Sequence, residues 1–393
     1  MVEPFPTPGF AVTGMLKRTK VAATIGPSCS ETDTLENVVR AGADACLLDL
    51  TQGKRTDWQA SYDVVREVEG LAKQPVAILA RINSADGQFS LANAISSGVI
   101  AWLAQQEIEY VTTSVAEGSR SIQQVREALD HAGSKAAILA RLDHGSNYRD
   151  IDSIIQSSDG VIVTSTGLSE LEKWSIPVMQ KMVARQCQIG AKPCVVQRGV
   201  LSSMQHALEP TDGEVFDIAN IVFDHADAIL LGDETATGNH PTEAVEVVSK
   251  TVIATESLME ITDRPIKVGF GQPPNTAALA YSIRHILKMQ EIAAVGVYSH
   301  TTSTAGVIAK NWIDCPILAL SDVPETVRKM GIYHGVVSRQ MKAPSNTAEM
   351  LSSTTSIAKQ IGLVAPGDRM IVVSELPLHT GENANAFVIE TIR

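Results

Sequence analysis

The stretch YVTTSVAEGSRSIQQVREALDHAGSKAAILARL, residues Tyr110–Leu142, contains the unit from which the fold can be predicted. Two short apolar runs, Tyr110–Val115 and Ala136–Leu142, are typical of buried β-strands. Between them, Gly118–Ala132 has the apolar spacing of an amphipathic helix. The stretch therefore predicts a strand, a helix and a second strand parallel to the first.

The same alternation continues on both sides of this unit. Six further apolar runs bring the number to eight, namely Lys20–Gly26, Ala43–Leu50, Pro75–Ile82, Gly160–Ser165, Lys192–Gln197 and Ala226–Gly232. Eight strands over roughly 220 residues, with helices between them, are typical of a (β/α)₈ TIM barrel. A doubly wound sheet has the same alternation, so the barrel prediction depends on the count of eight.

Proline and glycine interrupt two helical patterns near residues 262–274 and indicate a boundary. Beyond it the alternation resumes over about 125 residues, a usual size for a domain. We expect strands at Ala293–Ser299, Pro316–Ser321 and Arg369–Glu375, and helices at Thr276–Lys288, Thr304–Trp312, Pro324–Met330 and Ala348–Ile361. The sequence thus predicts an N-terminal arm at 1–16, a barrel at 17–265 and a smaller C-terminal α/β domain at 266–393.

Composition excludes several classes of protein. The 393 residues carry a formal net charge of −12 without blocks of basic residues, which argues against a nucleic-acid partner and favours small molecules. No apolar run is long enough to cross a membrane, and the first residues lack the pattern of a secretory signal. The five cysteines are scattered and odd in number, so we expect a cytoplasmic protein.

Three stretches resemble the pyruvate kinase family in sequence and in order. They are RTKVAATIGPS at Arg18–Ser28, SDGVIVT at Ser158–Thr164, and EPTDGEVFDIANIVFDHADAILLGDETATGNHPTEAV at Glu209–Val245. The resemblance implies a barrel followed by an effector domain, and a glycolytic kinase acting on phosphoenolpyruvate. It also implies a lid of about a hundred residues after the third strand, and here only residues 83–98 stand there. Without a lid, nothing excludes water from a phosphoryl transfer.

The resemblance also allows the family's catalytic positions to be checked one by one. The catalytic lysine, in a strand of the type I-A-K-I-E, falls on Arg141, and the metal-binding glutamate falls on Asp143. The second metal carboxylate, in an R-G-D-L-G turn, falls on Gly167. Magnesium is usually bound through one or two carboxylates, so Asp143 alone predicts at most a weak Mg²⁺ site, and no other cofactor is predicted.

Further substitutions replace the family's potassium ligands and its proton donor. The potassium positions fall on Leu47, Asp49, Thr51, Gly53 and Arg81, so a guanidinium replaces a ligand and no K⁺ is expected. The threonine associated with enolate protonation falls on Arg198.

Three arginines therefore reach strand ends on the face where a barrel keeps its site. We predict that Arg81, Arg141 and Arg198, together with Thr51, form a metal-poor pocket for an anion. The alternative is that each arginine is an ordinary solvated or ion-paired side chain.

The second domain retains a hydroxyl-rich loop between a strand and a helix. The loop resembles the family's effector loop of the form S-T-S-G-R-T, with Ser299, Thr301 and Thr304 at matching positions and Thr302 and Ser303 in place of glycine and arginine. Hydroxyls and amides at a helix start suit a phosphate, so these five residues are predicted to bind a phosphorylated effector. A helix cap without a ligand is the alternative.

Two interpretations of function remain open. In the first, the chain is a degenerate pyruvate kinase homologue that has little or no phosphotransferase activity and binds a phosphorylated or carboxylate metabolite, with a regulatory role toward a protein partner. In the second, it is an enzyme: either an active pyruvate kinase, or a lyase in which Arg141 stabilises an enolate and Asp143 holds a metal or acts as base. The family resemblance also leads us to expect a homo-oligomer, namely a homotetramer.

Overall fold

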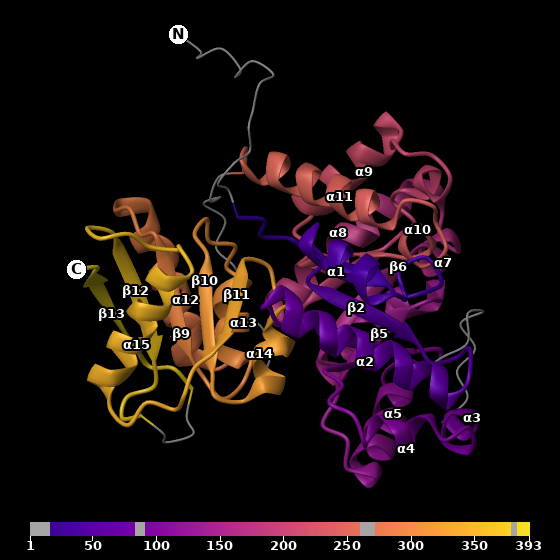
Figure 1. The fold of residues 1–393 in the computed structure, drawn as a ribbon, viewed down its shortest axis with the longest axis horizontal. Helices are drawn as coiled ribbons and strands as arrows, with labels where there is room; N and C mark the ends of the chain where they lie inside the picture. Colours follow the sequence, from indigo (N-terminus) through magenta and orange to yellow (C-terminus); the bar gives the residue numbers. More distant parts are fainter. Residues whose placement is uncertain (1–15, 83–90, 260–271, 379–382) are drawn as a thin grey trace.

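The computed structural model describes residues 16–82, 91–259, 272–378 and 383–393. They form two bodies, a barrel and a smaller layered domain beside it (Figure 1). The predicted N-terminal arm falls outside the described residues except at Leu16, and most of the predicted boundary region also falls outside them.

The first body is a closed barrel of eight parallel strands in chain order. The strands are β1 Lys20–Thr24, β2 Ala45–Asp49, β3 Ala77–Arg81, β4 Tyr110–Ser114, β5 Ala137–Leu142, β6 Gly160–Thr164, β7 Cys194–Gln197 and β8 Ala228–Leu231. Pairing of β1 with both β2 and β8 closes the barrel. The prediction of a TIM barrel is therefore confirmed, and a doubly wound sheet is excluded.

Helices surround this barrel, and the longer ones turn an apolar stripe toward the strands. They are α1 Thr32–Arg40, α2 Arg55–Ala72, α3 Leu91–Ser96, α4 Val99–Leu103, α5 Ser119–Ala132, α6 Ile151–Ser157, α7 Ser165–Ser169, α8 Ile176–Ile189, α9 Asp212–Phe223, α10 Asp233–Ala236 and α11 Pro241–Glu256. On α5, for example, the buried apolar residues Ile122, Val125 and Leu129 recur at helical spacing. The connection from β3 to α3 runs only from Ile82 to Ser90, too short for an inserted domain.

Each barrel strand has two faces with separate apolar cores. One face packs under the helices, and the other fills the lumen with Ala22, Leu47, Leu79, Leu139 and Ile162 among others. Alternation along the strands means that the next lumen position toward each strand's C-terminal end lies two residues farther on. At most of those next positions the residue is polar, so the lumen becomes polar toward its C-terminal mouth.

The second body is a five-stranded sheet in the order β11-β10-β9-β12-β13 with helices against it. Its strands are β9 Ala294–Tyr298, β10 Ile317–Ser321, β11 Val336–Gln340, β12 Arg369–Ser374 and β13 Ala386–Thr391, and its helices are α12 Pro274–Met289, α13 Ser303–Ala309, α14 Pro324–Met330 and α15 Thr347–Gln360. The α/β domain is confirmed, but β11 and β13 were not predicted. Strand β13 pairs antiparallel with β12 at the sheet edge, and three of its residues are exposed, so it lacks the apolar run of a buried strand.

The second domain covers the N-terminal ends of the barrel strands. The Gly335 amide donates to the Arg18 carbonyl at 2.9 Å, and Arg328 Nε donates to Glu109 Oε1 at 2.6 Å. The lumen core and part of the second domain's core belong to one continuous apolar cluster. The mouth at the C-terminal ends of the strands faces away from this contact. In the described parts of the chain, no helix is long and apolar enough to cross a membrane, and all five cysteines are buried free thiols.

Candidate functional site

The C-terminal mouth of the barrel gathers the polar lumen side chains of successive strands. Strand register places Asp49 opposite Arg81 and Arg81 opposite Thr112, while Ser114 lies opposite Arg141. Active sites of TIM barrels lie at this end. The mouth is therefore the candidate functional site.

Arg141 and Asp143 lie in the centre of this site and are held against each other. Arg141 is 5% exposed and Asp143 is 4% exposed. The guanidinium donates from Nε to Asp143 Oδ2 at 3.3 Å, from Nη2 to Asp143 Oδ1 at 3.4 Å, and from Nη1 to Gln197 Oε1 at 2.9 Å. Burial lowers the pKa of Arg141, Asp143 raises it and nearby Arg81 lowers it again. The charge of Arg141 is thus stabilised mainly by Asp143.

Arg81 and Thr51 both contact Asp49 at the neighbouring strand end. Arg81 Nη1 lies 3.7 Å from Asp49 Oδ2, with both side chains mostly buried. Thr51 is exposed, and its hydroxyl and amide donate to Asp49 Oδ1 at 2.5 and 3.0 Å. The structure therefore places Arg81 near Arg141 at the mouth of the barrel. The Thr51 side chain hydrogen-bonds to the Asp49 carboxylate, so its hydroxyl is already engaged.

Several buried polar atoms around this layer lack a hydrogen-bond partner among the described residues. They include Thr112 Oγ1, Ser114 Oγ and Glu234 Oε1. Glu234 is 1% exposed, and its other oxygen accepts from the Gly232 amide at 2.7 Å. Buried polar atoms are nearly always satisfied in folded proteins, so these atoms indicate a place for water or for a polar ligand.

Arg198 does not join the other two arginines, contrary to the sequence prediction. Its Nη1 donates to Gln180 Oε1 at 3.2 Å, and Gln180 is a buried residue of α8, the helix between β6 and β7. The physical reason is strand alternation, since Gln197 faces the lumen and its neighbour Arg198 turns to the helix side. Gln197 therefore takes the place beside Arg141 that had been assigned to Arg198.

The residues of the mouth do not fit a magnesium or potassium site. Both oxygens of Asp143 accept from Arg141, and Arg81 pairs with Asp49. A Cβ on Gly167 would lie 1.9 Å from the Leu142 carbonyl oxygen, so no carboxylate could stand there with this backbone. Among the residues that the structure describes, no group of three His, Cys, Asp or Glu could hold a metal ion.

The hydroxyl-rich loop forms its own turns at the start of α13. Ser299 Oγ accepts from the Thr301 amide at 3.2 Å, and Thr301 Oγ1 accepts from the Ser303 amide at 3.4 Å. Thr304 is buried inside the helix, and the side chain of the N-cap residue Thr302 makes no capping hydrogen bond to the helix. These contacts leave phosphate binding by the five residues a prediction.

Comparison with known proteins identifies the family. A family model described as "Pyruvate kinase, barrel domain" matches residues 94–245, and one described as "Pyruvate kinase, alpha/beta domain" matches residues 277–390. The chain belongs to the pyruvate kinase family. The matched residues include Arg141, Asp143, Gly167 and Arg198, whereas Arg81 precedes them.

Individual pyruvate kinases are similar over most of this chain. One from Geobacillus stearothermophilus is 27% identical over 291 residues, covering 73% of this chain and 50% of that protein. One from Agrobacterium vitis is 30% identical over 285 residues, covering 71% and 58%, and one from Clostridium perfringens is 27% identical over 293 residues, covering 73% and 62%. The chain thus spans between half and about three fifths of the length of these relatives.

Sequence reasoning missed three polar residues of the mouth, Thr112, Ser114 and Gln197. The pattern that could have found them is the period of two along each strand, extended past the last apolar residue. Glu214 and Glu234 lie in the stretch Glu209–Val245 that resembles the family, and the sequence leaves open whether each holds a loop or a subunit interface or contacts a substrate. In the structure the Glu214 carboxylate holds a loop, since it accepts from Ser203 and Thr211.

Proposed function

We propose that this chain is a pyruvate kinase homologue with little or no phosphotransferase activity, whose barrel mouth binds a small phosphorylated or carboxylate metabolite. One observation carries the proposal: Arg141 and Asp143, at the positions of the family's catalytic lysine and metal glutamate, engage each other. Phosphoryl transfer in this family's chemistry needs metal and a free cation on the transferring group. Here the carboxylate is already neutralised, and Gly167 leaves no room for the second one.

Anion binding at the mouth is supported by charge and by unsatisfied donors. Arg141 and Arg81 supply two guanidinium groups, and the hydroxyls of Thr112 and Ser114 supply donors that have no partner among the described residues. Guanidinium groups bind carboxylate and phosphate through two parallel hydrogen bonds. The anion would have to draw Arg141 partly away from Asp143, so we expect moderate affinity.

The decisive experiment measures pyruvate formation from phosphoenolpyruvate and ADP with magnesium. Each lost electrostatic or acid–base group removes about 10²–10⁴-fold in rate, so turnover should fall far below the ~1–100 per second of ordinary kinases. Turnover within tenfold of that range would refute the proposal and favour an active pyruvate kinase.

Binding is tested separately by calorimetry with phosphoenolpyruvate in the absence of magnesium. We expect saturable binding that weakens with salt. Replacing Arg81 by glutamine should weaken it by about 1.5–3 kcal/mol, the range for hydrogen bonds to charged groups. The matched control is Lys250→Gln, because the Lys250 side chain is 75% exposed on α11 and forms its ion pair with Glu246, one turn earlier on the same helix. Strict dependence on magnesium would contradict the metal-free pocket.

Self-association is also part of the proposal. Helix α9 carries Phe216 and Phe223, which are 69% and 46% exposed and seven residues apart, so they lie on one face of the helix. Trp174, in the short 3-10 helix Lys173–Ser175 before α8, and Val178, in the first turn of α8, are 76% and 65% exposed. Large exposed apolar side chains in proximity often mark an interface, and a second copy of this chain is the expected partner.

A further inference from the structure

A second polar pocket lies at the other end of the barrel, between its N-terminal strand ends and the C-terminal domain. Its volume is about 570 Å³, enough for a small metabolite. One wall consists mostly of residues just before or at the start of β4, β5, β6 and β7, with further residues from α5 and α6. The other wall consists of residues from α13 and α14, the residue that caps α13, and the segments just before α12 and just after α14. A ligand there would therefore touch both domains.

Positive charge dominates the lining of this interdomain pocket. Four basic residues and one carboxylate line it, namely Arg126, Lys135, Lys192, Lys329 and Asp159. The lining therefore carries a net charge of +3, although the whole chain carries −12. Gathering cations in one place costs stability unless something of opposite charge compensates them.

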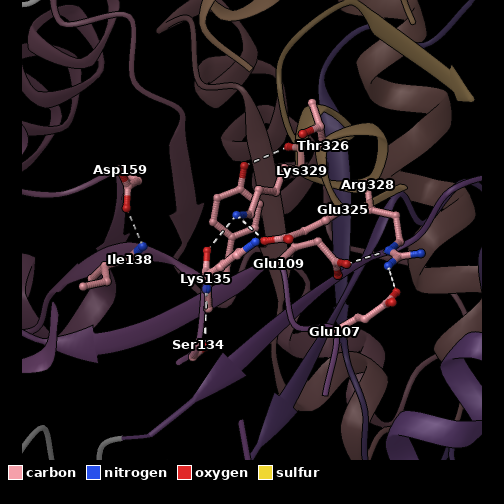
Figure 2. Close-up of polar contacts among 12 residues, drawn as sticks. Glu107, Glu109, Ser134, Lys135, Ile138, Asp159, Glu325, Thr326, Arg328 and Lys329 are labelled. Atoms are coloured by element: carbon pink, nitrogen blue, oxygen red, sulfur yellow. Dashed lines mark hydrogen bonds and ion pairs between the residues drawn. The ribbon is translucent and has the colours of Figure 1, made fainter. Parts of the chain in front are cut away.

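Two of the four cations are already paired with carboxylates. Arg126 Nη2 donates to Asp159 Oδ2 at 2.5 Å. Lys329 Nζ lies 2.6 Å from Glu325 Oε1 and donates to the Lys135 carbonyl at 2.9 Å, as Figure 2 shows. These two cations contribute little to the surplus charge.

The other two cations have no carboxylate partner among the described residues. Lys192 Nζ donates only to the Ser158 carbonyl oxygen, at 2.7 Å. The Lys135 ammonium makes no hydrogen bond or ion pair with another described residue, while the Lys135 carbonyl oxygen accepts from Lys329. The surplus charge of the interdomain pocket thus resides on Lys135 and Lys192, which precede β5 and β7.

A buried hydroxyl provides an independent sign of a ligand. Ser158 lines the pocket and is 1% exposed, yet its Oγ has no hydrogen-bond partner among the described residues. Leaving a buried hydroxyl unpaired is unfavourable, so natural structures rarely do it without a reason. Tyr333, Thr302 and Ser303, three residues with hydroxyl side chains, line the same pocket from the second domain.

We propose that this interdomain pocket binds a small phosphorylated metabolite with at least two negative charges, held by Lys135 and Lys192 and by the hydroxyl of Ser158. Single ammonium and hydroxyl donors suit the several oxygens of a phosphate, whereas a lone carboxylate is better matched by a free guanidinium fork. The site is separate from the barrel mouth and does not depend on the function proposed for it.

Pyrophosphate is a suitable probe for calorimetry on the full chain at low salt. We expect one saturable site in this pocket, and we expect Lys135→Gln and Lys192→Gln each to raise the Kd by about tenfold or more, as for a lost charged hydrogen bond. Lys135 is exposed, so its replacement should leave the fold intact. Lys250→Gln makes the same charge change far from the pocket and should leave the Kd within twofold.

Two further variants separate this pocket from the other candidate anion sites. Ser299→Ala combined with Thr301→Ala alters the hydroxyl-rich loop outside the pocket, and Arg81→Gln alters the barrel mouth. Both should leave pyrophosphate binding within twofold. The proposal is overturned if the wild type shows no saturable binding, or if the two lysine variants bind pyrophosphate as tightly as the wild type. Citrate bound more tightly than pyrophosphate would overturn the assignment to phosphate.

Discussion

A buried ion pair between Lys310 and Asp227 fastens the second domain to the base of the barrel. Lys310 follows α13 and is 1% exposed, and Asp227 precedes β8 and is 0% exposed. Besides the Lys310 ammonium, the Asp227 carboxylate accepts from the amides of Cys194 at 2.7 Å and His334 at 3.3 Å. The carboxylate is thus satisfied from both domains at once.

Replacing Lys310 by methionine keeps most of the side-chain volume and removes the charge. Breaking a buried pair by deleting one partner usually costs about 3–5 kcal/mol, because the other charge stays buried without compensation. The two amides that still donate to Asp227 should reduce the loss, so we expect about 3 kcal/mol. Adding Asp227→Asn removes the stranded charge and keeps an oxygen for one of the two amides, and should bring stability to within about 1–2 kcal/mol of the wild type.

Urea unfolding followed by circular dichroism measures these differences in the free energy of unfolding. If the two domains unfold at different urea concentrations, each is fitted as a separate transition. Lys250→Met, an exposed change of the same kind, should shift stability by no more than about 0.5 kcal/mol. The reasoning would be refuted by a Lys310→Met protein within about 1 kcal/mol of the wild type. A double variant less stable than the single one would refute it equally, because the stranded charge would then not be the cause.

Three further predictions address the barrel mouth, acid stability and assembly. Gly167→Asp is the change that the family resemblance predicts to restore the second metal carboxylate, but it should instead lower stability by about 2 kcal/mol or more through overpacking. Thr166→Asp on the exposed side of α7 should be nearly neutral, and equal urea midpoints for the two variants would contradict this. Burial lowers the pKa of His225 from 6.5 to about 4. The folded state therefore resists protonation more than the unfolded chain does, and stability should drop by roughly 2–3 kcal/mol between about pH 7 and pH 4. His225→Asn, which tolerates the positive φ of 67°, should flatten this part of the pH profile, and an unchanged profile would rule out the assignment. Light scattering should show the wild type as an oligomer that Phe216→Ser combined with Phe223→Ser dissociates; a wild-type monomer would exclude self-association.

The barrel could be predicted from the sequence because its strands are buried on both faces. Such strands consist of nearly continuous apolar runs, and eight of them at regular spacing leave few other folds. Strand β13 was missed for the opposite reason. It lies at a sheet edge with exposed residues, so its pairing with β12, rather than its own apolar content, defines it.

The sequence by itself determined the family and the barrel. From the family resemblance it also predicts that Arg141, Gly167 and Arg81 stand where the family has its catalytic lysine, its second metal carboxylate and a potassium ligand. Only the tertiary structure decided which side chains meet, because a shift of one residue along a strand moves a side chain to the other face. Because neighbouring residues of a strand face opposite sides, Gln197 lies beside Arg141 in the lumen and Arg198 points toward α8. The interdomain pocket likewise depends on the fold, since its residues range from Tyr110 to Tyr333 along the chain and share no motif. They become neighbours because closing the barrel brings successive strand starts to one end, where the second domain packs against them.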